Sequence, residues 1–159
     1  MAGQGERLRD AMVRGYVMAP GAYDALTARL VEQAGFPAVY LTGGGFSRSS
    51  GFPDYGLMTL TEIAGFLSRV CDVVDVPVVA DADNGHGSAV NVVRTVREYE
   101  RAGVAAFHME DQRAPKRCAH LGPSPVVPVA EMVGKVKAAV DTRRDQSVVI
   151  IARSDARAA

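Results

Sequence analysis

The chain alternates between helical and strand patterns, and this alternation limits its possible folds more than any other feature of the sequence. In the first unit, Leu26, Leu30 and Val31 recur on one helical face, and a glycine that can end the helix precedes an apolar strand. The same order returns along the rest of the chain. We expect helices at 24–34, 61–74, 88–102 and 129–143, and strands at 16–19, 38–41, 76–80, 104–109 and 148–152.

The predicted strands are short and largely apolar on both faces, as in a parallel sheet that helices cover. Strands joined by right-handed helical crossovers form either a doubly wound sheet or part of a (β/α)₈ barrel, and periodicity alone does not separate the two. Both architectures gather functional groups where the strands end. No Gly-x-Gly-x-x-Gly motif follows the first strand, which weakens the dinucleotide-binding version. Polar residues just past predicted strand ends are Thr42, Asp81, Asp83, Glu110, Asp111, Arg153 and Asp155.

The composition excludes several classes of protein. The 159 residues are 48% hydrophobic and 23% charged with a formal net charge of zero, unlike the basic surplus of nucleic-acid-binding proteins. No apolar run approaches the ~20 residues of a membrane span, and the polar N-terminus lacks the apolar segment of a secretory signal. The two cysteines, Cys71 and Cys118, fit neither a disulfide framework nor a paired zinc motif. We therefore expect a cytoplasmic protein that binds neither nucleic acid nor membrane.

The segment 80–87, with the sequence Ala-Asp-Ala-Asp-Asn-Gly-His-Gly, contains the strongest local signal. Alternation along a strand places Asp81 and Asp83 on the same side. Two neighbouring carboxylates repel each other unless a proton or a cation lies between them, and hard oxygen ligands suit Mg²⁺. Glu110, at the end of the next strand, could reach a metal-bound water. The alternative is a solvated aspartate-rich turn, with Glu110 as a helix cap or a surface carboxylate.

The loop 114–123 combines two cations, a thiol and an imidazole, contributed by Lys116, Arg117, Cys118 and His120. Cations beside a cysteine lower the pKa of its thiol, so that Cys118 could act as a general acid or base. Lys116 and Arg117 could bind substrate carboxylates. The alternative is an inert surface cysteine in a basic loop. Metal binding by Cys118 and His120 is disfavoured because no second cysteine–histidine pair lies nearby.

Further candidate residues lie near other strand ends. The glycine run 43–45 exposes backbone N–H groups that can receive a carboxylate or a phosphate, unless it is only a flexible loop. Arg153 is placed to bind a carboxylate in a bidentate manner. Asp54 either supports the metal site or a gating loop, or is an ordinary turn residue. We expect His108, inside a strand, to be a core histidine with a satisfied hydrogen bond.

Several motifs in register resemble those of the isocitrate lyase/phosphoenolpyruvate mutase superfamily, and most of all its 2-methylisocitrate lyases and the relatives that act on methyl-branched malates. The resemblance covers nearly the whole chain, and the combination of motifs is far more specific than any one of them. The matching segments are 20–25, 40–45, 81–87, 108–112, 116–120 and 152–156.

This resemblance implies a (β/α)₈ TIM-type barrel, with residues 1–159 as one partial barrel domain that holds about the first five βα units. A complete barrel needs roughly 200 residues or more, so we expect a shortened reading frame of a longer parent. Family members generally assemble as tetramers that exchange a helix, and we expect a homotetramer if the full barrel is made.

The resemblance also assigns roles to the candidate residues. It implies Mg²⁺, or Mn²⁺ in its place, at a site formed by Asp81 and Asp83, with Glu110 nearby through water. The residues that would bind substrate are Thr42, Gly43, Gly44, Asp54 and Arg153. The catalytic residues, on a mobile loop that closes over the ligand, would be Lys116, Arg117, Cys118 and His120.

The implied reaction cleaves a carbon–carbon bond in a small hydroxy di- or tricarboxylate. A base removes the hydroxyl proton, pyruvate or glyoxylate leaves, and Cys118 protonates the remaining dicarboxylate carbanion, which becomes succinate if the substrate is 2-methylisocitrate. The alternatives are an oxaloacetate decarboxylase, a phosphonopyruvate hydrolase or mutase of the same superfamily, and a non-catalytic fragment. Ala119 departs from the glycine that usually follows the cysteine.

Overall fold

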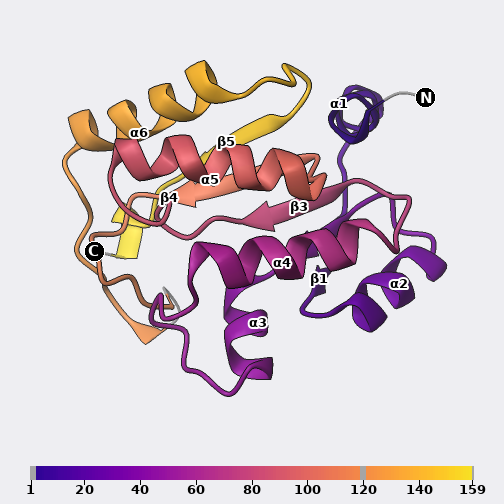
Figure 1. The fold of residues 1–159 in the computed structure, drawn as a ribbon, viewed down its shortest axis with the longest axis horizontal. Coiled ribbons are helices and arrows are strands. Elements are labelled where there is room, and N and C mark those ends of the chain that lie inside the picture. The colour runs from indigo at the N-terminus through magenta and orange to yellow at the C-terminus, as the bar shows by residue number, and fades with distance from the viewer. Residues whose placement is uncertain (1–2, 119–120, 159) are drawn as a thin grey trace.

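A five-stranded parallel sheet, with helices along one face, forms the centre of the computed structural model, which describes residues 3–118 and 121–158 (Figure 1). The strands are β1 (Gly21–Ala22), β2 (Val39–Leu41), β3 (Val78–Asp81), β4 (Ala106–Glu110) and β5 (Val149–Arg153). The helices are α1 (Gln4–Arg14), α2 (Ala25–Gln33), α3 (Gly43–Ser49), α4 (Leu60–Cys71), α5 (Ala89–Ala102) and α6 (Val129–Thr142), followed by a short 3₁₀ helix, η2 (Ala156–Ala158).

The strands lie in the sheet in chain order, and each neighbouring pair is parallel. A doubly wound sheet reverses its strand order at a switch point, whereas a barrel adds each new strand beside the previous one. The observed order therefore confirms the predicted barrel-type arrangement and rejects the doubly wound alternative. It also brings the C-terminal ends of all the strands to the same edge of the sheet.

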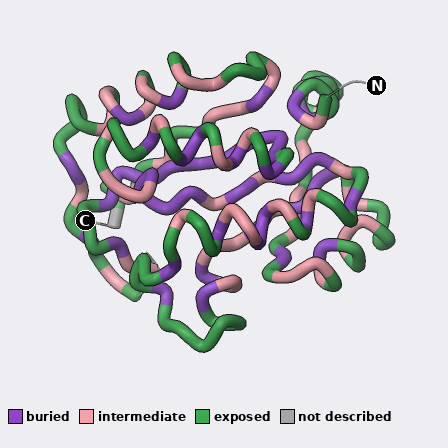
Figure 2. Tube along the Cα trace, viewed as in Figure 1, coloured by how far each residue is buried: buried purple, intermediate pink, exposed green. Residues whose placement is uncertain are grey.

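The hydrophobic core lies between the sheet and a layer formed by α2, α4, α5 and α6 (Figure 1). Leu41, Ala80 and Phe107 are neighbours in register across β2, β3 and β4, and all are buried. They belong to the same cluster as buried helix residues such as Val70 and Val96. Figure 2 shows the resulting gradient, in which β4 is buried along its whole length, buried and half-buried residues alternate in β2 and β3, and β5 is more exposed. Burial of this apolar surface is the main force that holds the helices on the sheet.

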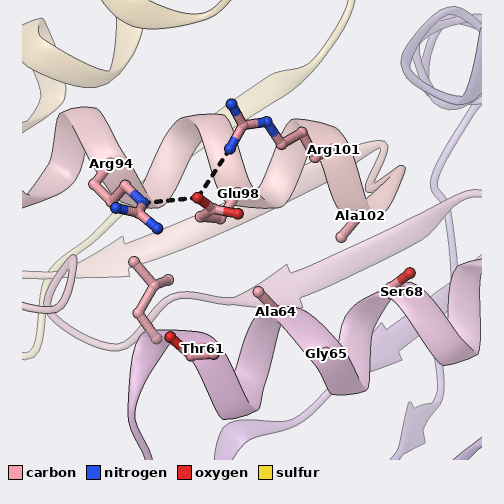
Figure 3. A pocket seen from close by; sticks show the side chains of 9 residues that line it. Thr61, Ala64, Gly65, Ser68, Arg94, Glu98, Arg101 and Ala102 are labelled. Carbon is pink, nitrogen blue, oxygen red and sulfur yellow. Dashed lines mark hydrogen bonds and ion pairs between the residues drawn. The ribbon is translucent and has the colours of Figure 1, made fainter.

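Helices α4 and α5 leave a shallow cavity between them, where Ala64 and Gly65 of α4 face the charged residues of α5 (Figure 3). Glu98 accepts hydrogen bonds from Arg94 Nε at 2.7 Å and from Arg101 Nη1 at 3.0 Å. Both arginines are largely exposed, so these ion pairs contribute little to stability. None of the residues that line this cavity is a predicted site residue.

Helix α1 lies across the edge of the sheet at which the strands begin, on the face opposite the helical layer. Leu8 is buried there with Ala105 and Ala106, and Val149 packs against the same cluster. Gly5 allows the close approach, because an added Cβ would lie 2.5 Å from the carbonyl carbon of Ser147. The sequence analysis did not predict this helix.

The predicted strand at 16–19 is wrong, and the first strand begins later, at Gly21. Tyr16 and Met18 are 91% and 52% exposed, and although Val17 packs against the Leu8 cluster, this segment joins none of the described strands of the sheet. Pairing starts where the carbonyl of Pro20 accepts a hydrogen bond from the Tyr40 amide, at 3.0 Å. The other predicted elements are present with their ends shifted by a few residues.

Helix α3 begins at the glycine run for which the sequence allowed a binding segment or a flexible loop. Thr42 caps the helix, because its hydroxyl oxygen accepts from the amide of Gly45 at 3.2 Å. Phe46 of the same helix stacks on Phe66 of α4 with the ring centroids 4.1 Å apart. Capping and this aromatic contact offset the low helix propensity of the glycines. Within residues 3–118 and 121–158, none of the helices has the length and apolar character that a membrane span requires.

The packing of α1 generates a first prediction. Replacing Gly5 by alanine should destabilise the protein by about 1–3 kcal/mol, because the new methyl group must push α1 away from the backbone at Ser147. The matched control is Gly134→Ala in α6, where an added Cβ meets nothing within 4 Å. That change should stabilise the protein by about 0.5–1 kcal/mol. Urea unfolding measures both, and equal effects of the two substitutions would disprove the close contact of α1.

Candidate functional site

A cavity of about 290 Å³ opens at the C-terminal edge of the sheet. It brings together nine of the predicted site residues, namely Thr42, Gly44, Asp54, Asp81, Glu110, Lys116, Arg117, Cys118 and Arg153. Asp83 lies beyond Lys116 and lines a neighbouring cavity of about 410 Å³. The predicted catalytic residue His120 lies outside the described residues. Most of the candidate residues therefore line one cavity, although they come from segments far apart in the chain.

Asp81 and Asp83 approach one point above the backbone of Gly43. A Cβ added to Gly43 would lie 3.0 Å from Asp81 Oδ2 and 3.4 Å from Asp83 Oδ1, so the glycine leaves open the space that both carboxylates face. Asp81 Oδ2 accepts from the Gly43 amide at 3.1 Å, and Asp81 Oδ1 accepts from the Asp83 amide at 2.9 Å. Asp83 has a φ of +47°, an uncommon conformation that aspartate tolerates better than most residues. These contacts fix the pair that the sequence predicted.

Lys116 supplies the positive charge closest to this pair. Its ammonium nitrogen lies 2.6 Å from Asp83 Oδ1 and also pairs with the carboxylate of Asp54, and all three side chains are buried. Burial and the nearby Asp81 raise the pKa of Asp83 to about 6, although Lys116 opposes the shift. Burial alone would lower the pKa of Lys116, but the carboxylates of Asp83 and Asp54 raise it above its ordinary value. Lys116 therefore stays protonated and compensates the clustered negative charge.

Tyr40 and His108 also belong to the site, and the sequence analysis did not assign them to it. The Tyr40 hydroxyl lies 3.2 Å from Asp81 Oδ2 and 2.8 Å from His108 Nε2, and the two rings stack. A carboxylate only accepts, so Tyr40 donates to Asp81 and the Nε2–H group of His108 donates to Tyr40. Alternation could have identified both residues, because Tyr40 precedes Thr42 by two positions and His108 precedes Glu110 by two.

The expectation of a satisfied core histidine is therefore only half correct. His108 Nε2 is bonded, but His108 Nδ1 is buried and has no hydrogen-bond partner among the described residues. Burial lowers the pKa of His108, and Asp81 opposes this shift. The ring is therefore neutral near pH 7. An unpaired, buried nitrogen lining a polar site is costly unless a ligand or a water satisfies it.

Glu110 and Arg153 form the wall of the cavity on the side of β5. Arg153 Nη1 lies 3.2 Å from Glu110 Oε2, and Arg153 Nε donates to Asp155 Oδ1 at 2.9 Å. Burial raises the pKa of Glu110 to about 7, although Arg153 opposes the shift. The Arg153 side chain remains 35% exposed, so its guanidinium can also reach a ligand in the cavity.

Cys118 reaches the cavity from the loop that follows β4. Its amide donates to the carbonyl of Asp54 at 3.0 Å, and its Sγ accepts from Arg48 Nη2 at 3.7 Å. Arg48 in α3 was not predicted, and no signal in the sequence points to it. Arg117 turns toward its own loop, where it donates to the Pro123 carbonyl and to Ser124 Oγ. The thiol therefore lines the same cavity as Asp81.

The residues present fit a hard divalent cation with few protein ligands. No group of three or more His, Cys, Asp or Glu side chains converges on one point within residues 3–118 and 121–158. Asp83 Oδ1 is buried and makes no hydrogen bond of good geometry in this part of the chain, despite its short ion pair with Lys116. Two carboxylates beside the open space at Gly43 suit Mg²⁺, which usually keeps several waters. Glu110, paired with Arg153, would act through water.

The raised pKa of Glu110 generates a second prediction. The folded pKa of about 7 exceeds the ordinary value of 4.5, so stability from this group is present below pH 4.5 and is lost as the pH rises through 7. Glu110→Gln should therefore gain stability relative to the parent between pH 4.5 and pH 8, on the order of 1–3 kcal/mol. Urea unfolding in EDTA measures this difference. The exposed Glu131→Gln serves as control, and a difference for Glu110→Gln that is constant with pH would refute the buried charge.

Comparison with known proteins agrees with this site. A family model described as phosphoenolpyruvate phosphomutase matches residues 8–159. Among curated proteins, the chain is 54% identical to 2,3-dimethylmalate lyase of Eubacterium barkeri over 142 residues, which cover 89% of this chain and 49% of that protein. It is 51% identical to 2-methylisocitrate lyase of Aeropyrum pernix over 144 residues, which cover 91% of this chain and 46% of that protein.

Solved structures show the same similarity in three dimensions. Phosphoenolpyruvate phosphomutase from Streptomyces platensis subsp. rosaceus superposes with a TM-score of 0.94 at 41% identity, covering 99% of this chain and 55% of that chain. A phosphonopyruvate hydrolase complex with oxalate and Mg²⁺ has a TM-score of 0.89 at 34% identity, covering 98% and 53%. The chain thus spans about half the length of the relatives it matches. It belongs to the phosphoenolpyruvate mutase/isocitrate lyase superfamily.

Proposed function

We propose that this chain provides the first five βα units, as one partial barrel domain over residues 1–159, of a Mg²⁺-dependent carbon–carbon lyase. The single observation that supports this most is the approach of Asp81 and Asp83 to one open point above Gly43, with the Cys118 thiol on the cavity that Asp81 also lines. The substrate class is a 2-methylisocitrate-like hydroxytricarboxylate or a branched malate. The lyases among the similar proteins support this choice.

Asp81 and Asp83 would hold the metal, and Glu110 would contact it through water. When bound, Mg²⁺ supplies positive charge to substrate oxygens on which negative charge develops. The phosphonopyruvate hydrolase complex with Mg²⁺ supports this choice of ion, and Mn²⁺ is the chemically closest substitute. Lys116 would keep Asp83 ionised and hold it in place, since its ammonium group lies beside that carboxylate.

Substrate carboxylates would bind at the two sides of the cavity. On one side, the Gly43 amide already donates to Asp81, which leaves Thr42 and the backbone of Gly44 to receive a carboxylate. On the other side, Arg153 would share its guanidinium between Glu110 and the ligand. A substrate bound in this way lies across the strand ends, between the metal ligands and the thiol.

Cleavage begins when a base takes the proton of the substrate hydroxyl group. The carbon–carbon bond then breaks, the hydroxyl carbon becomes the carbonyl of pyruvate or glyoxylate, and the electron pair remains on the other fragment. That fragment is a dicarboxylate if the substrate is a hydroxytricarboxylate and a monocarboxylate if the substrate is a branched malate. Cys118 would donate its proton to that carbon. Arg117 and His120, on the same loop as Cys118, are also proposed as catalytic residues. His120 lies outside the described residues. The loop excludes water, which strengthens the electrostatic interactions in the cavity.

The second candidate is a phosphonopyruvate hydrolase or mutase, or an oxaloacetate decarboxylase, of the same superfamily. The superposition with phosphoenolpyruvate phosphomutase favours it. The products separate the two candidates, because the lyase releases pyruvate or glyoxylate together with a second carboxylic acid, whereas the decarboxylase releases carbon dioxide and the hydrolase releases phosphate. A third candidate is a non-catalytic fragment, since the chain spans about half the length of its curated relatives. We also propose a cytoplasmic location, no nucleic-acid or membrane partner, and a homotetramer for the full barrel.

The proposed metal site predicts the effect of removing either aspartate. Asp81→Asn and Asp83→Asn should each weaken Mn²⁺ binding at least tenfold, because each removes one charged oxygen ligand. Calorimetry or the electron paramagnetic resonance signal of free Mn²⁺ measures the affinity without turnover. The control is Asp141→Asn, an exposed carboxylate on α6. Unchanged Mn²⁺ affinity in both site variants would exclude this metal site.

The proposed chemistry predicts which substrate is cleaved and what the thiol does. With Mg²⁺, the protein should release pyruvate from 2-methylisocitrate or from 2,3-dimethylmalate. Cys118→Ser should lower kcat by about 10²–10⁴ with little change in KM, because a general acid is lost while the binding groups remain. Release of carbon dioxide from oxaloacetate, or of phosphate from phosphonopyruvate, would favour the second candidate. The absence of turnover with all four substrates would favour the third.

A further inference from the structure

Gln112 is completely buried in the segment that connects β4 to the Cys118 loop. Its side chain makes two hydrogen bonds in opposite directions. Gln112 Nε2 donates to Asp155 Oδ2 at 2.7 Å, and Gln112 Oε1 accepts from the amide of Arg117 at 3.0 Å. The orientation of the amide is fixed, because a carboxylate only accepts and a backbone N–H only donates. One side chain thus joins Asp155, two residues after the end of β5, to the residue next to Cys118.

Both ends of this link reach groups of the proposed active site. Asp155 binds Arg153 through two contacts, at 2.9 and 3.3 Å, and Arg153 is the proposed carboxylate ligand. Arg117 lies between Lys116, which pairs with Asp83, and Cys118, the proposed proton donor. The side chain of Gln112 therefore joins Asp155 directly to the backbone of the loop.

The residue before Gln112 strengthens the same connection. Asp111 Oδ1 accepts from the Asp155 amide at 2.8 Å, and Asp111 Oδ2 accepts from Ser154 Oγ at 2.6 Å. The backbone after β5 is thus held firmly beside the backbone after β4. The hydrogen bond from the Arg117 amide to Gln112 Oε1 then connects the loop to this part of the backbone. Loss of a buried amide would leave the Arg117 N–H and one lone pair of Asp155 without their partners, which is costly.

We propose that Gln112 is a positioning residue that couples the place of the Cys118 thiol to the Arg153–Asp155 pair. The role of Gln112 in catalysis rests on the proposed lyase function. The link itself is a property of the folded protein, and it is testable without turnover.

The test measures the alkylation rate of each cysteine with iodoacetamide, read by mass spectrometry of the peptides. Gln112→Met keeps the size of the side chain and removes both hydrogen bonds. The Cys118 rate should rise about tenfold, the equivalent of one typical net hydrogen bond. The second cysteine, Cys71 in α4, reports global opening of the protein, because it is partly buried and burial raises the pKa of its thiol to about 12. Its alkylation rate should be unchanged. Gln146→Met, at an exposed glutamine, is the matched control.

A double-mutant cycle tests the coupling. Asp155→Ala should also raise the Cys118 rate in the parent protein, but should add little when Gln112 is already methionine. Three outcomes would each overturn the proposal. The Cys118 rate could be unchanged in Gln112→Met, both cysteines could react faster by the same factor, or the effects of the two substitutions could be additive. These experiments measure no turnover. The alkylation rates therefore test the link through Gln112 even if the protein has no lyase activity.

Discussion

The ammonium group of Lys116 holds together the carboxylates of Asp54 and Asp83, and the arrangement of the whole site depends on this buried triad. An isolated buried carboxylate would be expensive, and Asp81 adds further negative charge from two residues away. A cation brought in by the loop after β4 makes the cluster possible. The same contact fixes the loop, so that the Cys118 amide meets the Asp54 carbonyl. Charge compensation therefore places the thiol as well as the carboxylates.

The register of the sheet sets which polar groups become neighbours. Asp81 pairs with His108 across β3 and β4, and Glu110 pairs with Arg153 across β4 and β5. A slip of one residue in either pair would turn these side chains toward the apolar helical layer. The helix–sheet core, which excludes polar groups, thereby enforces the geometry of the site on the opposite face. The alternation of side chains along each strand therefore places apolar residues in the core on one face of the sheet and the candidate site residues on the other.

The last strand differs from the others in its surroundings. Ile151 of β5 is 39% exposed, and an apolar cavity of about 640 Å³ lies between α6 and the end of β5. In a closed barrel, further strands pair with such an edge and cover such a surface. The chain spans about half the length of the relatives that it matches.

The sequence by itself determined the helix–strand alternation, the parallel sheet, and the position of Asp81, Asp83, Glu110 and Arg153 at strand ends, because periodicity and chain order are local properties. The family resemblance added the barrel and a proposed role for the loop. Only the tertiary structure decided which of these groups touch. It paired Lys116 with two aspartates, bound Arg153 to Glu110, and brought Tyr40 and His108 beside Asp81.

The errors have the same physical origin. The apolar run at 16–19 has the pattern of a strand, but it pairs with none of the five described strands, and only every second residue, Val17 and Ala19, is half-buried. The glycines at the start of α3 have low helix propensity, yet Thr42 and the stacking of Phe46 make them helical. Charge pairing, register and packing join residues that are tens of positions apart, and a pattern read along the chain does not contain those contacts. Local chemistry selected the candidate residues, and the long-range energy of burying their charges together determined the site.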